Sequence, residues 1–276
     1  MSKIFVDIGN TRVKFARPAG PQRELRDGIS SFLHDDICYA PTRGGDFSAL
    51  NAWLVDAKDV EFIISSVNSV GFETLRSYLG ERFPAASVRR LVTSDIPLAT
   101  NVAPEEGMGV DRVLASYAAS LHCSAEAALV IGAGTAVTMD LLLPSKLLNR
   151  GIIHPGKASM LDALLSGTEI PSESRDAMLA SVTTPPPPAA STTTIPSLGA
   201  GIYAAFVGGV CFAAKRILDE LPEETPFEVF LTGGDAPLLN TPLEELVCHY
   251  SNAVLRNVSN LVLEGIGYFS HQETDQ

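Results

Sequence analysis

The feature that most constrains the fold is a strand, a glycine turn and a return strand that occur twice. In residues 3–16 an apolar run ends in Asp7 and is followed by the turn Gly9-Asn10-Thr11. In residues 128–141 another apolar run ends in the turn Gly134-Thr135. Both return strands alternate apolar and polar residues, which is typical of a strand with one buried face. A pattern that recurs about 125 positions later predicts internal duplication and two similar halves.

The length agrees with this interpretation, because 276 residues suffice for two domains of ordinary size. We expect an α/β fold with an N-terminal half of residues 1–115 and a C-terminal half of residues 116–276. Apolar periodicity predicts helices at 110–121, 158–165, 198–218 and 243–263 and a buried strand at 227–231. Residues 18–28 are rich in proline, glycine and charge, which predicts a loop, and the four prolines at 185–188 predict an exposed polyproline loop.

Composition and charge exclude several classes of protein. Hydrophobic residues make up 46% of the chain and charged residues 19%, which predicts a well-packed core and excludes a largely disordered chain. The net charge of −12 disfavours nucleic acids and anionic membranes as partners. This charge favours a small-molecule enzyme. We see no uninterrupted apolar run approaching the ~20 residues of a membrane helix. Four scattered cysteines predict neither disulfides nor a zinc site, so we expect reduced thiols in the cytoplasm.

Three junctions between a strand and a turn combine glycine with threonine: Gly9-Asn10-Thr11, Gly134-Thr135 and Thr232-Gly233-Gly234. Glycine lets backbone N–H groups approach a phosphate, and threonine adds a hydroxyl donor. Beside the first turn, Asp7 is suited to hold a Mg²⁺-bound water and Lys14 to neutralise phosphate charge. Any one such junction is often only structural, but three together indicate a nucleotide site. Neither the Walker pattern nor the protein-kinase catalytic loop is present in the sequence.

A fourth segment, Gly109-Val110-Asp111-Arg112, stands where a helix is predicted to begin. An aspartate there is either a helix cap or first-turn residue, or a general base that accepts the proton of an attacking hydroxyl. In the second case Arg112 would hold an anionic group of the substrate. Asp140 has two interpretations as well, a metal-facing carboxylate or the polar end of a strand.

Read in order, these segments resemble the motifs of type III pantothenate kinases, in the actin-like ATPase and acetate and sugar kinase superfamily. The segment from Asp7 to Lys14 matches D-x-G-N-T-x-x-K, and the segment 109–112 matches G-x-D-R. Residues 134–140 match the second phosphate motif, residues 151–156 match G-x-I-x-P-G, and residues 232–235 match T-G-G-D. The resemblance runs across nearly the whole chain.

The resemblance implies two ribonuclease-H-like halves with a nucleotide cleft between them, and a homodimer. It further implies ATP, Mg²⁺ and a monovalent cation (K⁺ or NH₄⁺) as cofactors, and phosphorylation of pantothenate to 4′-phosphopantothenate, the first step of coenzyme A biosynthesis. By the same resemblance Asp111 is the catalytic base. The residues expected to bind ATP are Asp7, Ile8, Gly9, Asn10, Thr11, Arg12, Val13, Lys14, Gly134, Thr135, Thr232, Gly233 and Gly234. The residues expected to contact pantothenate are Gly109, Val110, Asp111, Arg112 and Thr194.

Some positions depart from the family pattern. Many members have an aspartate two residues before the second-motif glycine, where it helps to hold the monovalent cation, and this chain has Gly132. Potassium dependence is therefore an open question. The leucine after the Pro-Gly turn is Lys157 here, and the tyrosine upstream of G-x-D-R is not evident.

Two other functions stay open at the level of sequence. One is a catalytically weak or inactive family member that acts as a regulatory accessory protein. The other is an actin-like kinase or phosphatase that acts on a sugar, acetate or polyphosphate.

Overall fold

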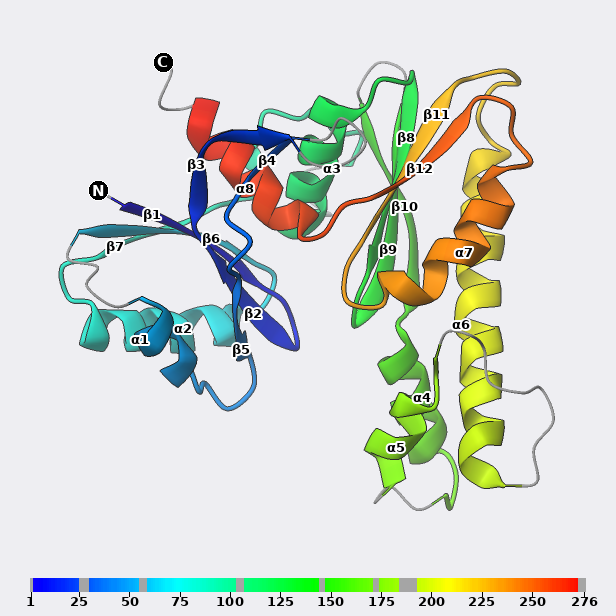
Figure 1. The fold of residues 1–276 in the computed structure, drawn as a ribbon, viewed down its shortest axis with the longest axis horizontal. Helices are drawn as coiled ribbons and strands as arrows, with labels where there is room; N and C mark the ends of the chain where they lie inside the picture. Colours follow the sequence, from blue (N-terminus) through cyan, green and yellow to red (C-terminus); the bar gives the residue numbers. More distant parts are fainter. Residues whose placement is uncertain are drawn as a thin grey trace. The chain divides into compact units, whose positions relative to one another are not determined.

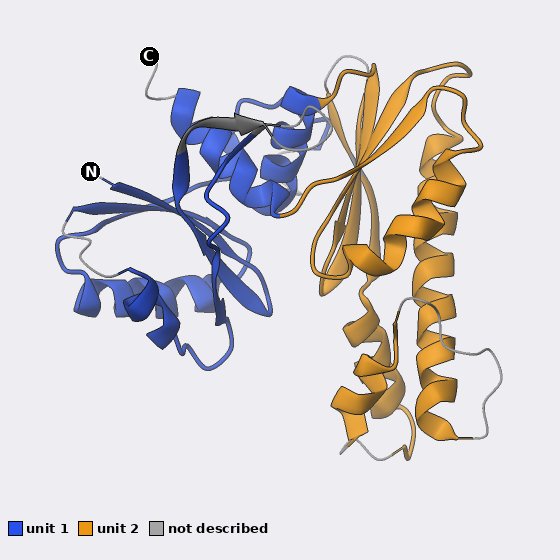
Figure 2. Cartoon of the chain, in the orientation of Figure 1, with its two compact units in different colours: residues 1–122, 260–276 blue, residues 123–259 orange. Residues whose placement is uncertain are grey.

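The computed structural model describes residues 2–24, 30–54, 59–102, 107–143, 147–170, 174–183 and 193–272. The chain forms two compact units, residues 1–122 with 260–276 and residues 123–259 (Figure 2). The polyproline loop predicted at 185–188 lies outside the described residues.

Unit 1 is built on a five-stranded sheet with the strand order β5-β2-β1-β6-β7 (Figure 1). Helices α1 and α2 lie on one face of this sheet, and α3 and α8 lie on the other. The elements of unit 1 are β1 (Ser2–Ile8), β2 (Arg12–Ala16), β3 (Pro18–Glu24), β4 (Ser30–Leu33), β5 (Cys38–Pro41), α1 (Ser48–Trp53), β6 (Val60–Ser66), α2 (Ser69–Arg82), β7 (Ser87–Arg90), a 3₁₀ turn (Thr93–Asp95), α3 (Val110–His122) and α8 (Leu261–Gln272).

Unit 2 has a second five-stranded sheet, with the order β10-β9-β8-β11-β12. Helices α6 and α7 pack against each other and against this sheet. The elements of unit 2 are β8 (Ala127–Ala133), β9 (Ala136–Leu142), β10 (Leu148–Pro155), α4 (Lys157–Ser166), α5 (Arg175–Ala180), α6 (Thr194–Leu218), β11 (Phe227–Thr232), α7 (Ala236–Val247) and β12 (Ala253–Asn257).

The two sheets have the same connectivity, which is what a duplicated unit requires. In each sheet the central strand, β1 or β8, is antiparallel to the next strand along the chain and parallel to a later one. The first two strands of each unit form the hairpin that the sequence predicts. The prediction of two α/β halves with mixed sheets flanked by helices is therefore confirmed.

The compact units differ from the expected halves at both boundaries. The boundary expected after residue 115 falls inside α3, which continues to His122. The C-terminal helix α8, which we expected in the second half, packs against α3 and β1 in unit 1. Gly265 lies so close to the backbone of Leu114 that an added Cβ would be 2.3 Å from its carbonyl oxygen. In addition, the ammonium of Lys3 in β1 donates a hydrogen bond of 2.7 Å to the Ser270 hydroxyl. Long-range packing thus decides where this helix belongs.

Two local predictions were wrong. The helix predicted at 243–263 is three elements, because α7 ends at Val247 and β12 and α8 follow. The loop predicted at 18–28 includes β3, which pairs with β4 in a two-stranded sheet whose register is irregular between Pro18 and Arg23. Proline lacks the N–H that a strand ladder needs, so this pairing is tolerated only outside a central sheet position.

Helix α6 is long and apolar enough to cross a membrane by length and composition alone, contrary to the expectation that no apolar run approaches that length. The core helix of a globular unit meets the same criteria. Nine of the residues in α6 are buried, and the helix packs against α4, α5, α7, β9 and β10. Its apolar character therefore has an explanation in the core of unit 2.

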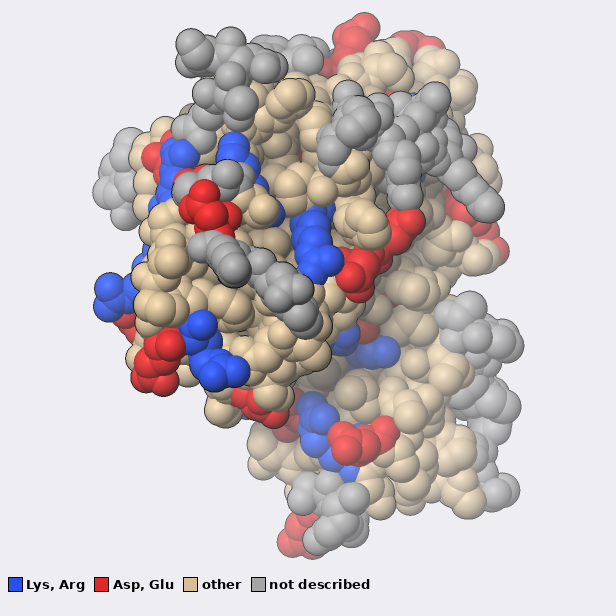
Figure 3. Space-filling view, turned by 60° about the vertical axis from the view of Figure 1, so that its left-hand side comes forward, with Lys and Arg blue, Asp and Glu red and all other residues tan. Residues whose placement is uncertain are grey.

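Charge is distributed without a large basic area on the face shown in Figure 3. There, the lysine and arginine side chains of the described residues are interspersed with aspartate and glutamate. On that face the described residues form no extended basic surface.

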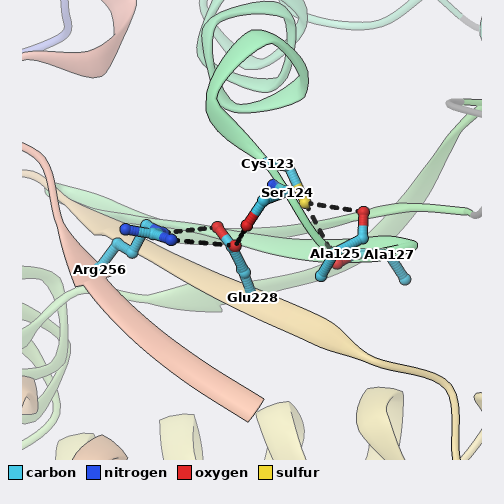
Figure 4. A network of polar contacts seen from close by, with 6 residues as sticks. All are labelled: Cys123, Ser124, Ala125, Ala127, Glu228 and Arg256. Carbon is cyan, nitrogen blue, oxygen red and sulfur yellow. Dashed lines mark hydrogen bonds and ion pairs between the residues drawn. The ribbon is translucent and has the colours of Figure 1, made fainter. Parts of the chain in front are cut away.

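A polar network joins β11 and β12 of unit 2 to the segment just before β8 (Figure 4). The carboxylate of Glu228 in β11 accepts a hydrogen bond of 2.6 Å from Arg256 Nε in β12, and another of 2.6 Å from the hydroxyl of Ser124, just before β8. Glu228 is only 2% exposed. Hydrogen bonds from both partners stabilise the ionised form and lower the pKa of Glu228, although burial acts in the opposite direction.

Candidate active site

The first glycine turn is held by hydrogen bonds to the start of β2 and to Thr42, the residue after β5. The N–H of Gly9 donates to the carbonyl of Arg12 (3.1 Å). Thr42, next to the end of β5, donates from its hydroxyl to the carbonyl of Gly9 (2.8 Å) and from its N–H to the carbonyl of Thr11 (3.1 Å). Thr42 was not predicted, because only the tertiary pairing of β2 with β5 brings it to this turn.

The residues around this turn divide into two groups by burial. Ile8 and Val13 have no exposed surface, so their side chains belong to the core and only their backbone could contact a ligand. Asn10, Thr11 and Arg12 are exposed. A phosphate would therefore meet the turn and not the strands that carry it.

Asp7 places a carboxylate in a buried position next to the turn. Its Oδ2 atom lies 3.8 Å from Nζ of Lys14, its partner on β2. An ion pair alone would lower the pKa of Asp7, yet burial outweighs Lys14, and the nearby charge of Asp111 opposes ionisation further. The pKa of Asp7 is therefore raised from 3.8 to about 6. Because burial disfavours the ionised form of this carboxyl group, a bound cation would stabilise the carboxylate strongly, which suits Asp7 to a cation-binding role.

Asp111 lies in the first turn of α3, where the helix dipole favours a negative charge. Its Oδ1 atom accepts a hydrogen bond of 2.8 Å from the N–H of Arg112. The first-turn interpretation is therefore correct. It does not exclude the catalytic one, because the carboxylate of Asp111 lies near enough to Asp7 to raise the pKa of that residue. Unit 1 thus brings together three of the predicted residues, Asp7, Lys14 and Asp111.

In unit 2 the second glycine turn is packed under the start of α4. The N–H of Gly134 donates to the carbonyl of Ala136 (3.1 Å). The carbonyl of Thr135 accepts from the N–H of Gly156 (3.1 Å) and from the hydroxyl of Ser159 (2.8 Å). These bonds fix the turn, and Thr135 is exposed beside it.

The third junction, which follows β11, packs against Ala133, the last residue of β8 before the second glycine turn. Gly233 has φ of +105°, and a Cβ there would lie 2.1 Å from the carbonyl oxygen of Ala133, so no other residue fits. The N–H of Asp235 donates to that carbonyl (3.1 Å). Its carboxylate Oδ1 atom lies 3.3 Å from Nζ of Lys157, the first residue of α4. The sequence does not predict this ion pair, although Lys157 departs from the family pattern.

Two hollows of unit 2 contain predicted residues. A hollow of about 630 Å³ between α4 and α6 is lined by Leu164, Thr193, Thr194, Ser197, Leu198, Gly201 and Ile202. A second one, of about 450 Å³, lies where β11, α7 and β12 meet and includes Thr232 and Gly233. Both volumes are in the range of sites for small molecules.

The position of Asp140 contradicts one of its two interpretations, the polar end of a strand. It lies inside β9 and not at the end of that strand, and it is 2% exposed. The described residues contain no group of three or more His, Cys, Asp or Glu side chains that could hold a metal ion by themselves.

Comparison with known proteins agrees with this arrangement of motifs. A sequence profile described as type III pantothenate kinase matches residues 3–216. The chain belongs to the type III pantothenate kinase family. The type III pantothenate kinase of Saccharophagus degradans is 30% identical over 255 residues, 88% of this chain and 90% of the relative. The one from Chromobacterium violaceum is 28% identical over 264 residues, 96% of this chain and 97% of the relative.

Solved structures support the fold of this kinase. An archaeal actin homolog aligns with a TM-score of 0.50 at 14% identity and covers 99% of this chain and all of its own. A ROK family glucokinase from Streptomyces griseus aligns with a TM-score of 0.50 at 10% identity and the same coverage. At such low identity these alignments show the actin-like fold alone, and they confirm the predicted fold class.

Proposed function

We propose that this kinase transfers the γ-phosphoryl group of ATP to the primary hydroxyl of pantothenate and so forms 4′-phosphopantothenate for coenzyme A biosynthesis. Membership of the family supports the substrate. The observation that carries the mechanism is the group Asp7, Lys14 and Asp111 in unit 1, where two carboxylates and an ammonium lie at the end of a strand and the start of a helix.

ATP phosphates are bound by the first turn, residues 9–11, together with Lys14. The second turn, Gly134-Thr135, and the segment 232–234 contribute further backbone and hydroxyl donors. The hollow of about 450 Å³ beside Thr232 and Gly233 supports a place for the nucleoside, because its volume suits one and it adjoins the phosphate segments.

The carboxylate of Asp7 fits Mg²⁺, which proteins bind through one or two carboxylates, water and substrate phosphates. When bound, Mg²⁺ neutralises charge on the transferred phosphoryl group. Asp7 is the residue that would hold it, through water. A cation there would also favour the ionised state of Asp7, whose pKa is about 6 without one.

Asp111 serves as the general base that accepts the proton of the pantothenate hydroxyl. Phosphoryl transfer depends mainly on positioning and charge neutralisation, so one base near the nucleophile is sufficient. Arg112 is only 9% exposed and is suited to hold the carboxylate of pantothenate in a desolvated pair. Thr194, which lines the hollow of about 630 Å³, offers a hydroxyl to the same substrate. We propose further that the kinase acts as a homodimer in the cytoplasm.

The test is ADP release by the purified protein, measured with and without pantothenate in the presence of ATP and Mg²⁺. Asp111→Asn should lower kcat by a factor on the order of 10²–10⁴ while ATP binding is retained. Thr194→Val should raise the KM for pantothenate about tenfold with little change in the KM for ATP. The control is Asp46→Asn, which removes an exposed carboxylate of unit 1.

Each other outcome identifies one of the alternatives. Near-normal turnover of Asp111→Asn would refute the assignment of the base. Phosphorylation of a sugar or of acetate in place of pantothenate would indicate another actin-like kinase. ATP binding without turnover of any of these substrates would favour a regulatory accessory protein.

A further inference from the structure

The duplicated sheets allow residues of the two units to be compared position by position. The cross-strand pair nearest the turn is Ile8 with Val13 in unit 1 and Ala133 with Val137 in unit 2, and the next pair away from the turn is the one compared here. The residues at that position of the central strand are Asp7 in unit 1, paired with Lys14 and Ser65, and Gly132 in unit 2, paired with Thr138 and Thr232.

The comparison shows a difference in charge. Unit 1 has an acid and a lysine facing each other across the hairpin, whereas the equivalent positions of unit 2, Gly132 and Thr138, carry no charge. A Cβ on Gly132 would have only the hydroxyl of Thr138 within 4 Å, at 3.0 Å. The carboxylate with which many family members hold a monovalent cation is therefore missing at this place. The residues at this position do not fit such an ion.

Unit 2 nevertheless has an acid–lysine pair at the same end of its sheet. Lys157 and Asp235 come from the segments after β10 and β11, and their charged atoms lie 3.3 Å apart. Each segment is attached to the β8–β9 hairpin. The N–H of Gly156, next to Lys157, donates to Thr135, and the N–H of Asp235 donates to Ala133. The lysine is thus fixed beside the second glycine turn.

The burial of this pair suits a ligand-binding role. The side chains of Lys157 and Asp235 are 21% and 16% exposed, so they are largely removed from water but still accessible. By contrast, the pair Lys215 and Asp219 on α6 has side chains that are 55% and 43% exposed. A partly desolvated ammonium interacts more strongly with a phosphate than an exposed one does.

We propose that Lys157 binds the nucleotide phosphates at the second glycine turn and supplies, as a fixed charge, what a bound monovalent cation would supply. The inference rests on the proposed function. It predicts that this kinase works without K⁺ or NH₄⁺. Lysine is suited to this role because its ammonium is a compact point charge that binds phosphate.

The first experiment measures pantothenate-dependent ADP release in a buffer free of K⁺ and NH₄⁺, and then with each added. We expect kcat/KM to stay the same. A rise of about tenfold or more on adding either ion would overturn the proposal. If no activity is found under any condition, the proposed function fails, and ATP binding without pantothenate, measured by calorimetry, still tests the role of Lys157.

The second experiment compares ATP affinity and turnover in Lys157→Met and Lys157→Arg, with Lys215→Met as the matched control. We expect Lys157→Met to weaken ATP binding by a factor on the order of 10 to 100 in the cation-free buffer. Added K⁺ or NH₄⁺ should not restore this loss, because the residues at Gly132 and Thr138 do not fit such an ion. Lys157→Arg, which keeps the charge, and Lys215→Met should bind ATP nearly as the unchanged protein does.

A merely structural ion pair would give a different pattern. In that case Lys157→Met would lower the thermal stability and bind ATP with unchanged affinity once folded. That result would refute the proposal.

Discussion

Asp7 offers a direct test of the electrostatics of unit 1. A buried carboxylate whose role is to bind a ligand should lower the free energy of unfolding when that ligand is absent. We predict that Asp7→Asn makes unit 1 more stable at neutral pH and at the same time abolishes tight binding of ATP. Asparagine is close to aspartate in size, so the change removes the charge and leaves the packing of the buried site nearly the same.

The size of the effect follows from the pKa of Asp7, which folding raises from 3.8 to about 6. A carboxylate with a raised pKa binds its proton more tightly in the folded state, so stability falls as the pH rises between these two values. Each unit of pKa corresponds to about 1.4 kcal/mol, which gives a cost of about 3 kcal/mol above pH 6. This figure already includes the attraction of Lys14, since the pKa of about 6 results from all the charges near Asp7.

The assay is urea unfolding of the nucleotide-free protein in EDTA, followed by tryptophan fluorescence. The chain has a single tryptophan, Trp53, and it lies in α1 of unit 1, so the signal reports the unit that contains Asp7. We expect Asp7→Asn to be more stable by up to about 3 kcal/mol near pH 7.5, and by only about 1 kcal/mol near pH 4.5, where the folded unmodified protein is mostly protonated at this site.

The control is Asp46→Asn, because the pKa of Asp46 is lowered by hydrogen bonds from Ser48 and its loss should not stabilise the unit. Equal or lower stability of Asp7→Asn near neutral pH would refute the reasoning. So would a gain that is the same at both pH values, since it would not come from ionisation.

Two further predictions concern unit 2 and are measured by thermal and urea unfolding. Glu228→Gln should destabilise the unit by about 3 kcal/mol, because Arg256 would keep a largely buried charge without its partner. In the unmodified protein the pKa of Glu228 is lowered, so this stabilisation is complete at a pH above the ordinary pKa of a glutamate and is lost as the pH falls through the lowered pKa. A loss below about 1 kcal/mol would show that the network in Figure 4 adds little. Gly233→Ala should cost about 3 kcal/mol or more and weaken ATP binding, because it combines positive φ with a backbone clash at Ala133. Its control, Gly208→Ala on α6, meets no atom within 4 Å and should be neutral or slightly stabilising.

Much of the fold was predictable because the signals are local. The hairpins at 3–16 and 128–141 were recognised from alternation and a turn, and both are present as β1–β2 and β8–β9. Helices α3, α4 and α6 begin and end within a few residues of the prediction. Strand β12 was missed, because a short edge strand that is only half buried has no clear apolar alternation.

The candidate site was predictable only in part. The motifs named Asp7, Lys14 and Asp111, and the structure places these three together in unit 1. The motifs could not name the ion pair of Lys157 with Asp235, because its partners lie on segments far apart in the chain. The two side chains come together because the segments after β10 and β11 both pack against the β8–β9 hairpin.

By itself, the sequence determined the secondary structure of the two hairpins, the order of the phosphate motifs and the family, since each depends on residues close together in the chain. Only the tertiary structure decided that α8 belongs to unit 1, that Asp7 is buried deeply enough to raise its pKa to about 6, and that Lys157 meets Asp235. The physical reason is the same in each case. Burial and ion pairing depend on which surfaces exclude water from one another, and residues distant in the chain settle that.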